Sequence, residues 1–218
     1  MKLSQRLYEE VREIWDGYYE HPFVKGIGTG KLEKEKFKFY MIQDYIYLLD
    51  YARVFALGVV KSKDEETMRK FSEFEYGILN GEMAVHKHYC KELGISSQEI
   101  KNTKISMANL SYTNYMLWVG QSQGVLDLLV TILACSWSYE LIGKELSSRH
   151  DMTGNPYSKW VQSYASQEYH ELSQDIIDMV DKMGENCTQA EYENLKEIFV
   201  NCSRHEALFW DMSHDMKM

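Results

Sequence analysis

Residues that interrupt regular structure are scarce in this chain of 218 residues, which contains 2 prolines and 13 glycines. Their scarcity favours long uninterrupted elements, because proline breaks a helix interior and glycine weakens it. No linker rich in serine, proline or glycine divides the chain, and no unit of fixed length recurs. We therefore expect a single domain over residues 1–218, large enough to bury roughly 70% of its unfolded surface.

A basic surface is also missing. Lys and Arg number 24 against 33 Asp and Glu, which gives a net charge of -9. Binding to a nucleic-acid backbone needs a positively charged face, and binding to an anionic membrane needs a polybasic segment. The start of the chain is charged and lacks the apolar core of a signal peptide, and the apolar run 128–134 is too short to span a bilayer. The sequence predicts a cytoplasmic protein that binds neither nucleic acid nor membrane.

Metal and disulfide motifs are incomplete. The four cysteines, at positions 90, 135, 187 and 202, form no Cys-x-x-Cys pair, so we expect free thiols. Glu75, Glu82 and His86 share one face of a predicted helix, but a di-iron bundle needs two Glu-x-x-His elements and the chain has none. We interpret these three residues as surface charges. His21, at a helix end, is a weak candidate for a haem ligand. The sequence therefore predicts no metal and no cofactor.

Apolar residues recur at spacings of three and four along nearly the whole chain, and no segment alternates as a strand would. We expect an all-α helical bundle of about seven helices. Residues 25–30, which hold three glycines, are predicted to form a loop, because no strand precedes them as a dinucleotide site requires. Ser96 and Thr188 carry the pattern of a capping box, which predicts a short helical turn after Ser96 and the start of the last helix after Thr188. The predicted helices cover residues 4–19, 33–61, 64–93, 106–123, 125–147, 156–183 and 189–214.

The helix over residues 33–61 combines a carboxylate with phenols on a face that is otherwise apolar. Asp44, Tyr47 and Tyr51 fall within one arc of about 60°, together with Tyr40. A buried carboxylate is costly unless something hydrogen-bonds it. One interpretation is a polar network that fixes the core, and the other is a pocket wall with one anchoring acid.

Two further residues could carry chemistry. Cys135 lies in the most apolar stretch of the chain, with Tyr139 one helical turn later. A buried thiol is usually a packing residue, although it can also be a nucleophile. Glu206 lies in a run of apolar and aromatic residues, where desolvation would suit a general acid, or it is exposed and pairs with Arg204 or His205.

Three stretches resemble the TenA family, whose members are thiaminase II and aminopyrimidine aminohydrolase proteins. They are Phe-Tyr-Met-Ile-Gln-Asp-Tyr-Ile-Tyr-Leu from residue 39, continuing with Tyr-Ala-Arg-Val-Phe-Ala from residue 51; Leu-Ala-Cys-Ser-Trp-Ser-Tyr from residue 133; and Arg-His-Glu-Ala-Leu-Phe-Trp-Asp-Met from residue 204. The resemblance covers essentially the whole chain. It implies a haem-oxygenase-like fold without haem, a homotetramer, and a hydrolase of thiamine salvage. Such a hydrolase releases hydroxymethylpyrimidine from aminomethylpyrimidine or thiamine.

The resemblance also implies a role for each residue. Cys135 would be the nucleophile and Glu206 the acid, while Tyr47 and Tyr112 would tune the thiol. The implied substrate-binding residues are Asp44, Tyr51, Tyr139, Tyr164 and Phe209, of which Tyr51 and Phe209 could stack on the ring. One departure is His205, where the family pattern has an aromatic residue, usually tyrosine. The alternative is a non-catalytic pyrimidine-binding or thiamine-binding regulator on the same fold. A nucleophile with an acid favours the enzyme, because a sensor needs ring contacts only.

Overall fold

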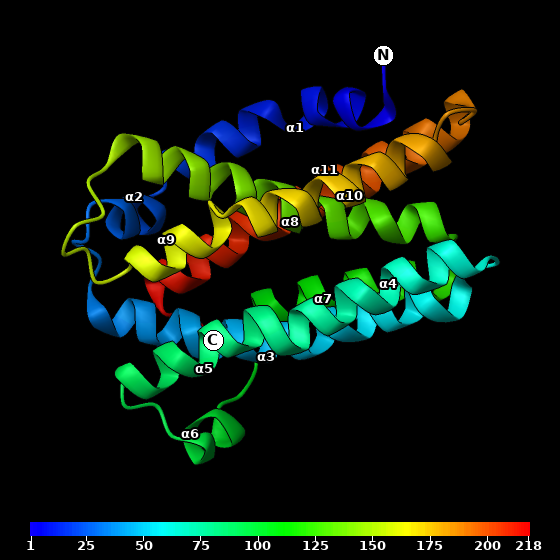
Figure 1. The fold of residues 1–218 in the computed structure, drawn as a ribbon. Helices are drawn as coiled ribbons and strands as arrows, with labels where there is room; N and C mark the ends of the chain where they lie inside the picture. Colours follow the sequence, from blue (N-terminus) through cyan, green and yellow to red (C-terminus); the bar gives the residue numbers. More distant parts are fainter. The chain divides into compact units, whose positions relative to one another are not determined.

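The computed structural model describes all of residues 1–218 and contains helices joined by loops, without strands (Figure 1). The all-α class is confirmed. The elements are α1 (Leu3–Glu20), α2 (Pro22–Gly28), α3 (Lys34–Lys61), α4 (Glu65–Gly77), the π-helix η1 (Ile78–Glu82), α5 (Met83–Glu92), α6 (Ser97–Asn102), α7 (Met107–Ser122), α8 (Val125–Arg149), α9 (Ser158–Tyr164), α10 (Gln167–Met183) and α11 (Gln189–Asp215).

The chain forms two compact units. The first unit comprises residues 1–32 and 126–210, and the second comprises residues 33–125 and 211–218. Each unit has a core of its own, built on one long apolar helix: α8 in the first and α3 in the second. The single domain that the sequence predicts over residues 1–218 stays a prediction.

In the first unit, α1 buries a stripe that includes Leu7, Val11 and Trp15, with the helical spacing that the sequence predicts. The indole Nε1 of Trp15 donates to Ser203 Oγ over 2.9 Å, which ties α1 to α11. By length and composition the whole of α8 could cross a membrane, whereas the apolar run 128–134 within it is too short to do so. However, 72% of its most apolar window is buried inside the protein, as in a core helix.

In the second unit, α3 packs against α4, α5 and α7. A buried network joins α3 to the start of α7: the Gln43 carbonyl accepts from Asn109 Nδ2 over 2.7 Å, and Gln43 Oε1 accepts from the Ser106 amide over 3.0 Å. The Ser106 hydroxyl also caps α7 by accepting from the Asn109 amide. These bonds fix the start of α7, the helix that carries Tyr112.

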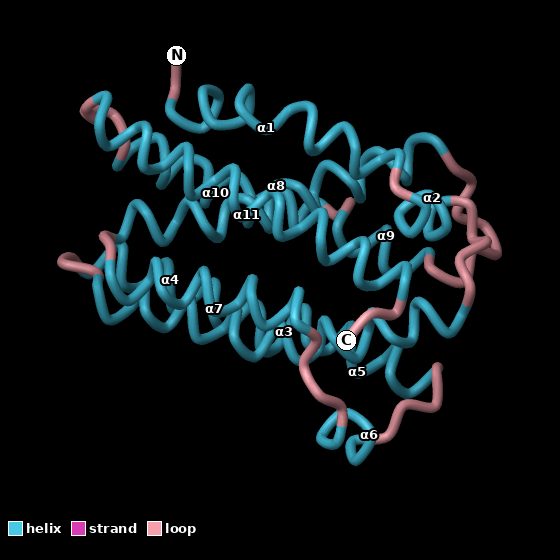
Figure 2. Tube along the Cα trace, turned by 180° about the vertical axis from the view of Figure 1, so that it is seen from behind, coloured by secondary structure: helices cyan, strands magenta, loops and turns pink.

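Two predicted boundaries are wrong, and capping side chains explain both. Residues 22–28 form helix α2 rather than the start of a loop, because Pro22 opens the helix and the His21 ring accepts from the Phe23 amide. The predicted helix over residues 156–183 is two helices, since Ser166 caps a new start by accepting from the Tyr169 amide. Figure 2 shows the helices and the loops between them from behind.

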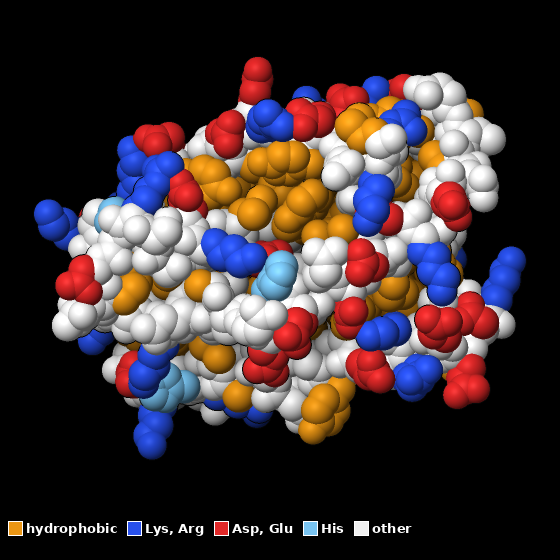
Figure 3. All heavy atoms as spheres, turned by 45° about the horizontal axis from the view of Figure 1, so that its top comes forward, with side chains coloured by type: hydrophobic (Ala, Val, Ile, Leu, Met, Phe, Trp, Pro, Cys, Tyr) orange, Lys and Arg blue, Asp and Glu red, His pale blue; other side chains and the backbone are white.

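The surface carries both signs of charge. Figure 3 shows acidic and basic side chains interspersed over the face that it presents, with hydrophobic side chains exposed between them. Several oppositely charged neighbours form ion pairs, among them Lys38 with Glu99 at 2.9 Å. On that face, positive charge does not gather into the continuous patch that a nucleic acid would need.

Candidate active site

The structure buries every residue to which the sequence assigns a role, in two groups. The first unit holds Cys135, Tyr139, Tyr164, Glu206 and Phe209, and the second unit holds Asp44, Tyr47, Tyr51 and Tyr112. Glu206 is only 2% exposed, which excludes the alternative of a surface glutamate.

In the first unit, helices α8, α9 and α11 supply a wall of aromatic rings. Tyr139 lies 4.9 Å from Tyr164 and 5.1 Å from Trp210, measured between ring centroids. Trp160 packs edge-on against Tyr164 at 4.8 Å. Offset and edge-on contacts of this kind hold rings in defined orientations. Two predicted substrate-binding residues, Tyr139 and Tyr164, are therefore in mutual contact.

The close approach of α8 to α9 depends on Gly143. A Cβ at this position would lie 2.7 Å from the Ala165 nitrogen and 2.7 Å from the Tyr164 carbonyl carbon, which are backbone atoms. Any side chain here would push the end of α9 away from α8. Gly143 follows Tyr139 by one helical turn, so it sets the spacing at which Tyr139 meets Tyr164.

Tyr18, on α1, is a buried phenol to which the sequence assigns no role. Its hydroxyl donates to the Ser203 carbonyl. Burial raises the pKa of Tyr18 well above its ordinary value, and the charges of Glu206 and then Cys135 raise it further. Tyr18 therefore lies within electrostatic range of both Cys135 and Glu206. The only sequence signal was its place on the buried face of α1, where a phenol needs a hydrogen-bond partner.

A second thiol belongs to the same surroundings. Cys202 is fully buried on α11, one turn before Glu206. Burial raises the pKa of Cys202 well above its ordinary value, and the Glu206 charge adds to the shift. Cys202 is thus held as a neutral thiol at ordinary pH, which suits a packing residue rather than a nucleophile.

In the second unit, the predicted tyrosines form a stack. Tyr47 lies 5.3 Å from Tyr51, with the rings nearly parallel, and 5.5 Å from Tyr112 on α7. The Tyr47 hydroxyl donates to Met116 Sδ at 3.7 Å. Tyr51 continues the aromatic run by packing edge-on against Phe55 at 4.8 Å. Three residues with predicted roles are therefore in direct contact through their rings.

Asp44 pairs with a histidine rather than with the tyrosines of its own helix. Asp44 Oδ2 lies 2.6 Å from Nε2 of His86 on α5, and both side chains are almost completely buried. The interpretation of His86 as a surface charge is therefore wrong. Burial alone lowers the pKa of His86, but the Asp44 carboxylate more than offsets this effect and the pKa is raised. Within the second unit, Asp44 Oδ1 accepts no hydrogen bond.

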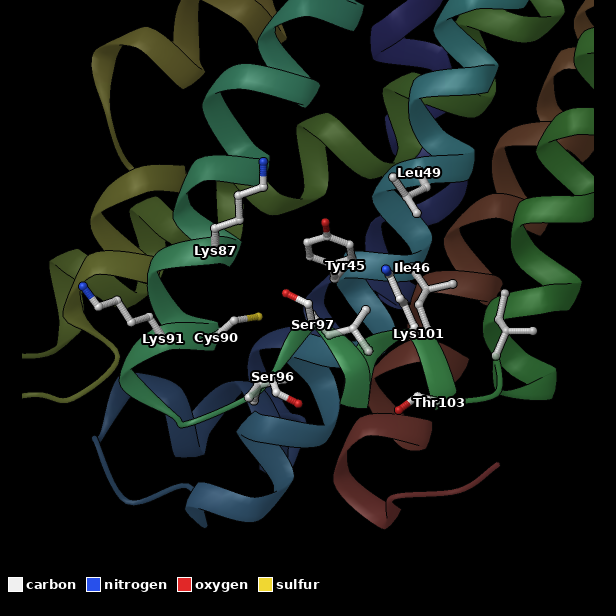
Figure 4. Close-up of a pocket in the computed structure, with 13 residues that line it drawn as sticks. Tyr45, Ile46, Leu49, Lys87, Cys90, Lys91, Ser96, Ser97, Lys101 and Thr103 are labelled. Carbon is white, nitrogen blue, oxygen red and sulfur yellow. The ribbon is translucent and has the colours of Figure 1, made fainter.

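An open groove of about 900 Å³ lies beside α3, α5 and α6. Figure 4 shows Tyr45 reaching it from α3 and Lys87 from α5, the neighbours in sequence of Asp44 and His86. None of the residues with predicted roles lines this groove. Its lining comprises Tyr45, Ile46, Leu49, Lys87, Cys90, Lys91, Ile95, Ser96, Ser97, Ile100, Lys101, Thr103 and Ile105. The structure arranges no group of three or more His, Cys, Asp or Glu side chains to hold a metal ion.

A sequence profile of the TENA/THI-4/PQQC family matches residues 8–216. The chain belongs to this family. Two relatives named aminopyrimidine aminohydrolase are each 44% identical: one from Halalkalibacterium halodurans, covering 100% of this chain and 98% of the relative, and one from Helicobacter pylori, covering 98% and 99%.

Solved structures agree with membership of the TENA/THI-4/PQQC family. A crystal structure described as a TenA family transcription regulator from Silicibacter is 30% identical, with a TM-score of 0.90 over 97% of this chain and 96% of that one. Haem oxygenase 2 from Chlamydomonas reinhardtii, solved without haem, is 14% identical, with a TM-score of 0.63 over 97% of each chain. The latter likeness concerns the fold alone and confirms the haem-oxygenase-like class.

Proposed function

We propose that this protein is an aminopyrimidine aminohydrolase of thiamine salvage, with Cys135 as its nucleophile. The observation that carries the proposal is full-length identity of 44% to two aminopyrimidine aminohydrolases in a chain that buries both Cys135 and Glu206. The substrate is a small pyrimidine that carries an aminomethyl group, or thiamine itself. Water replaces the amine or the thiazole, and hydroxymethylpyrimidine is released.

Each chemical step has a residue suited to it. The Cys135 thiolate adds to the ring carbon next to the substituted carbon, while Glu206 protonates a ring nitrogen. The ring then donates electrons to expel the leaving group from the methylene carbon: the thiazole leaves as a neutral ring, and the amine takes up a proton and leaves as ammonia. Water adds to that carbon and loses a proton, which balances the proton taken by the amine. Loss of Cys135 and of the ring proton then restores aromaticity. The scheme uses side chains and water only, so it requires no metal and no cofactor.

The remaining residues bind the ring and tune the thiol. Asp44 accepts a hydrogen bond from the exocyclic amino group, and Tyr51 and Phe209 contribute flat surfaces. Tyr139 and Tyr164 contact the ligand from their shared wall. Two further roles support the chemistry: Tyr47 and Tyr112 favour the thiolate by phenol hydrogen bonding.

The deciding experiment measures turnover of aminomethylpyrimidine and of thiamine by the wild type and by Cys135→Ala. We expect the variant to lose hydrolysis by at least about 10³-fold, because no other residue supplies the nucleophile. It should still bind hydroxymethylpyrimidine in calorimetry. Cys90→Ala is the matched control, since Cys90 is also a buried thiol, and it should turn over normally.

The outcomes separate the candidate functions. Equal turnover by Cys135→Ala and wild type rejects the cysteine mechanism. Binding of hydroxymethylpyrimidine without any turnover by the wild type favours the alternative, a pyrimidine-binding regulator, a function in line with the description of the Silicibacter relative. We also propose a cytoplasmic homotetramer, on the family resemblance. Sedimentation equilibrium should then give four times the chain mass of 25.7 kDa, and any smaller assembly rejects the tetramer.

A further inference from the structure

We propose that His86 is a positioning residue, which holds Asp44 as an anion in one orientation and thereby presents its free oxygen to the pyrimidine amino group. The inference rests on the proposed function and extends it to a residue that the sequence pattern indicated to be a surface charge. The contact is short, at 2.6 Å between His86 Nε2 and Asp44 Oδ2. Its two side chains are 1% and 5% exposed, so solvent does not compete for the pair.

The second ring nitrogen of His86 fixes where the protons are. Nδ1 lies 3.0 Å from the backbone carbonyl of Glu82, and a carbonyl oxygen can only accept. Nδ1 therefore carries a hydrogen. Nε2 faces a carboxylate, so a ring that satisfies both contacts donates from both nitrogens and is an imidazolium. The charged groups that act on His86, Asp44 and Glu82, are both acidic and favour this form.

The π-helix that precedes α5 explains why His86 faces Asp44. Residues 78–82 form one wide turn between α4 and α5, and Glu82, the last of them, supplies the carbonyl that holds His86 Nδ1. A wide turn accommodates one additional residue, which rotates everything after it by about 100° relative to a continuous α-helix. The turn thus sets the face of α5 that meets α3, and π-turns of this kind are frequent at functional sites.

The arrangement leaves one acceptor for a ligand. His86 occupies Oδ2 of Asp44, whereas Oδ1 accepts no hydrogen bond within the second unit. A neutral His86 ring has one hydrogen to share between two acceptors, so it must release either Asp44 or the Glu82 carbonyl. Affinity for the pyrimidine should therefore fall as pH rises through the folded-state pKa of His86, which lies above its ordinary value of about 6.5.

The test is the pH dependence of aminomethylpyrimidine hydrolysis by the wild type, His86→Gln and His88→Gln. Glutamine can still donate to Asp44 but cannot carry charge. We expect His86→Gln to raise KM about tenfold or more, with kcat changed less than about threefold, and to lose the alkaline rise in KM. His88 lies on the same helix, half-exposed and paired with Glu92 at 2.9 Å, so the same substitution there should leave both constants unchanged.

Other results overturn the proposal. If His86→Gln folds with the wild-type KM at all pH values, or loses only kcat, His86 is a structural residue and does not position Asp44. Should the variant fail to fold, nitrogen NMR of the wild-type histidine rings decides. A His86 ring protonated on both nitrogens at neutral pH supports the proposal, and a neutral ring rejects it. Failure of the wild type to hydrolyse any pyrimidine is a separate result that rejects the proposed function, and the NMR measurement distinguishes the two.

Discussion

At the scale of single residues, the two oxygens of Asp44 have different surroundings, and this difference predicts the effect of Asp44→Asn. His86 donates to Oδ2, while Oδ1 is the acceptor proposed for the pyrimidine amino group. An asparagine amide places a donor where one of these acceptors stood, so either His86 or the ligand faces a donor. We expect the Kd for hydroxymethylpyrimidine to rise about 10-fold to 100-fold in calorimetry, as for loss of a charge-assisted hydrogen bond.

The matched control for this substitution is Asp50→Asn on the same helix. Asp50 is partly exposed and pairs with Arg53, so an uncharged amide there removes only a surface ion pair. Its Kd should equal that of the wild type. Unchanged affinity in Asp44→Asn would remove Asp44 from the proposed binding residues, and weakened affinity in both variants would point to a general electrostatic effect.

The burial of the candidate residues could be predicted from the sequence, whereas their contacts across the chain could not. Helical spacing placed Asp44 and its tyrosines on a buried face, and the structure buries them all. The partner of Asp44 could not be predicted, because His86 lies 42 residues away and faces α3 only after the π-turn. Tyr18 was missed for the same reason: its partners, Ser203 and Glu206, are on the last helix of the chain.

At the scale of elements, the contact between α8 and α9 predicts that Gly143→Ala damages the protein. The added methyl would lie 2.7 Å from backbone atoms of Tyr164 and Ala165, which cannot rotate away as a side chain could. We expect a loss of about 1–3 kcal/mol in the free energy of unfolding, measured by urea titration, as for other overpacked sites. Tyr164 should move with α9, so KM for aminomethylpyrimidine should rise as well.

Gly17→Ala provides the comparison for this substitution. Gly17 lies within α1 and is exposed, and a Cβ there would meet no atom within 4 Å. Alanine is the better helix former, so this variant should gain about 0.5–1 kcal/mol and keep the wild-type KM. If Gly143→Ala has the same free energy of unfolding as the wild type, α9 can shift without loss of stability. Gly143 would then not set the position of α9.

Long elements were predictable because their signals lie within a few residues of each other. The spacing of apolar residues predicted α1, α3, α7, α8 and α11 to within about two residues, the usual uncertainty of helix ends. Short elements lack this spacing signal: α6 was predicted from its capping box at Ser96, which the structure confirms, but α2 was not predicted. Helix α2 buries Phe23, Val24 and Ile27 under neighbours that are remote in sequence, and those contacts outweigh the glycines that indicated a loop.

At the scale of the whole molecule, three buried groups predict how stability depends on pH. The pKa values of His86, Cys202 and Tyr18 are all raised in the folded state, His86 by Asp44 against the effect of burial, and the other two mainly by burial. A raised pKa means that the folded state binds the proton more tightly than the unfolded chain. The contribution is fully present below the unfolded-state pKa and is lost as pH rises through the folded-state pKa.

Since all three shifts have the same sign, the free energy of unfolding should decline on the alkaline side in successive stages. The first decline begins above about pH 6.5, where His86 of the unfolded chain loses its proton. The second begins at about pH 8.5 for Cys202, and the third at about pH 10 for Tyr18. Urea titrations across this range should show the first decline abolished in His86→Gln and the second reduced in Cys202→Ala. A free energy of unfolding that stays constant from about pH 6 to 10 in the wild type would contradict the assignment, because each unit of pKa difference changes it by about 1.4 kcal/mol.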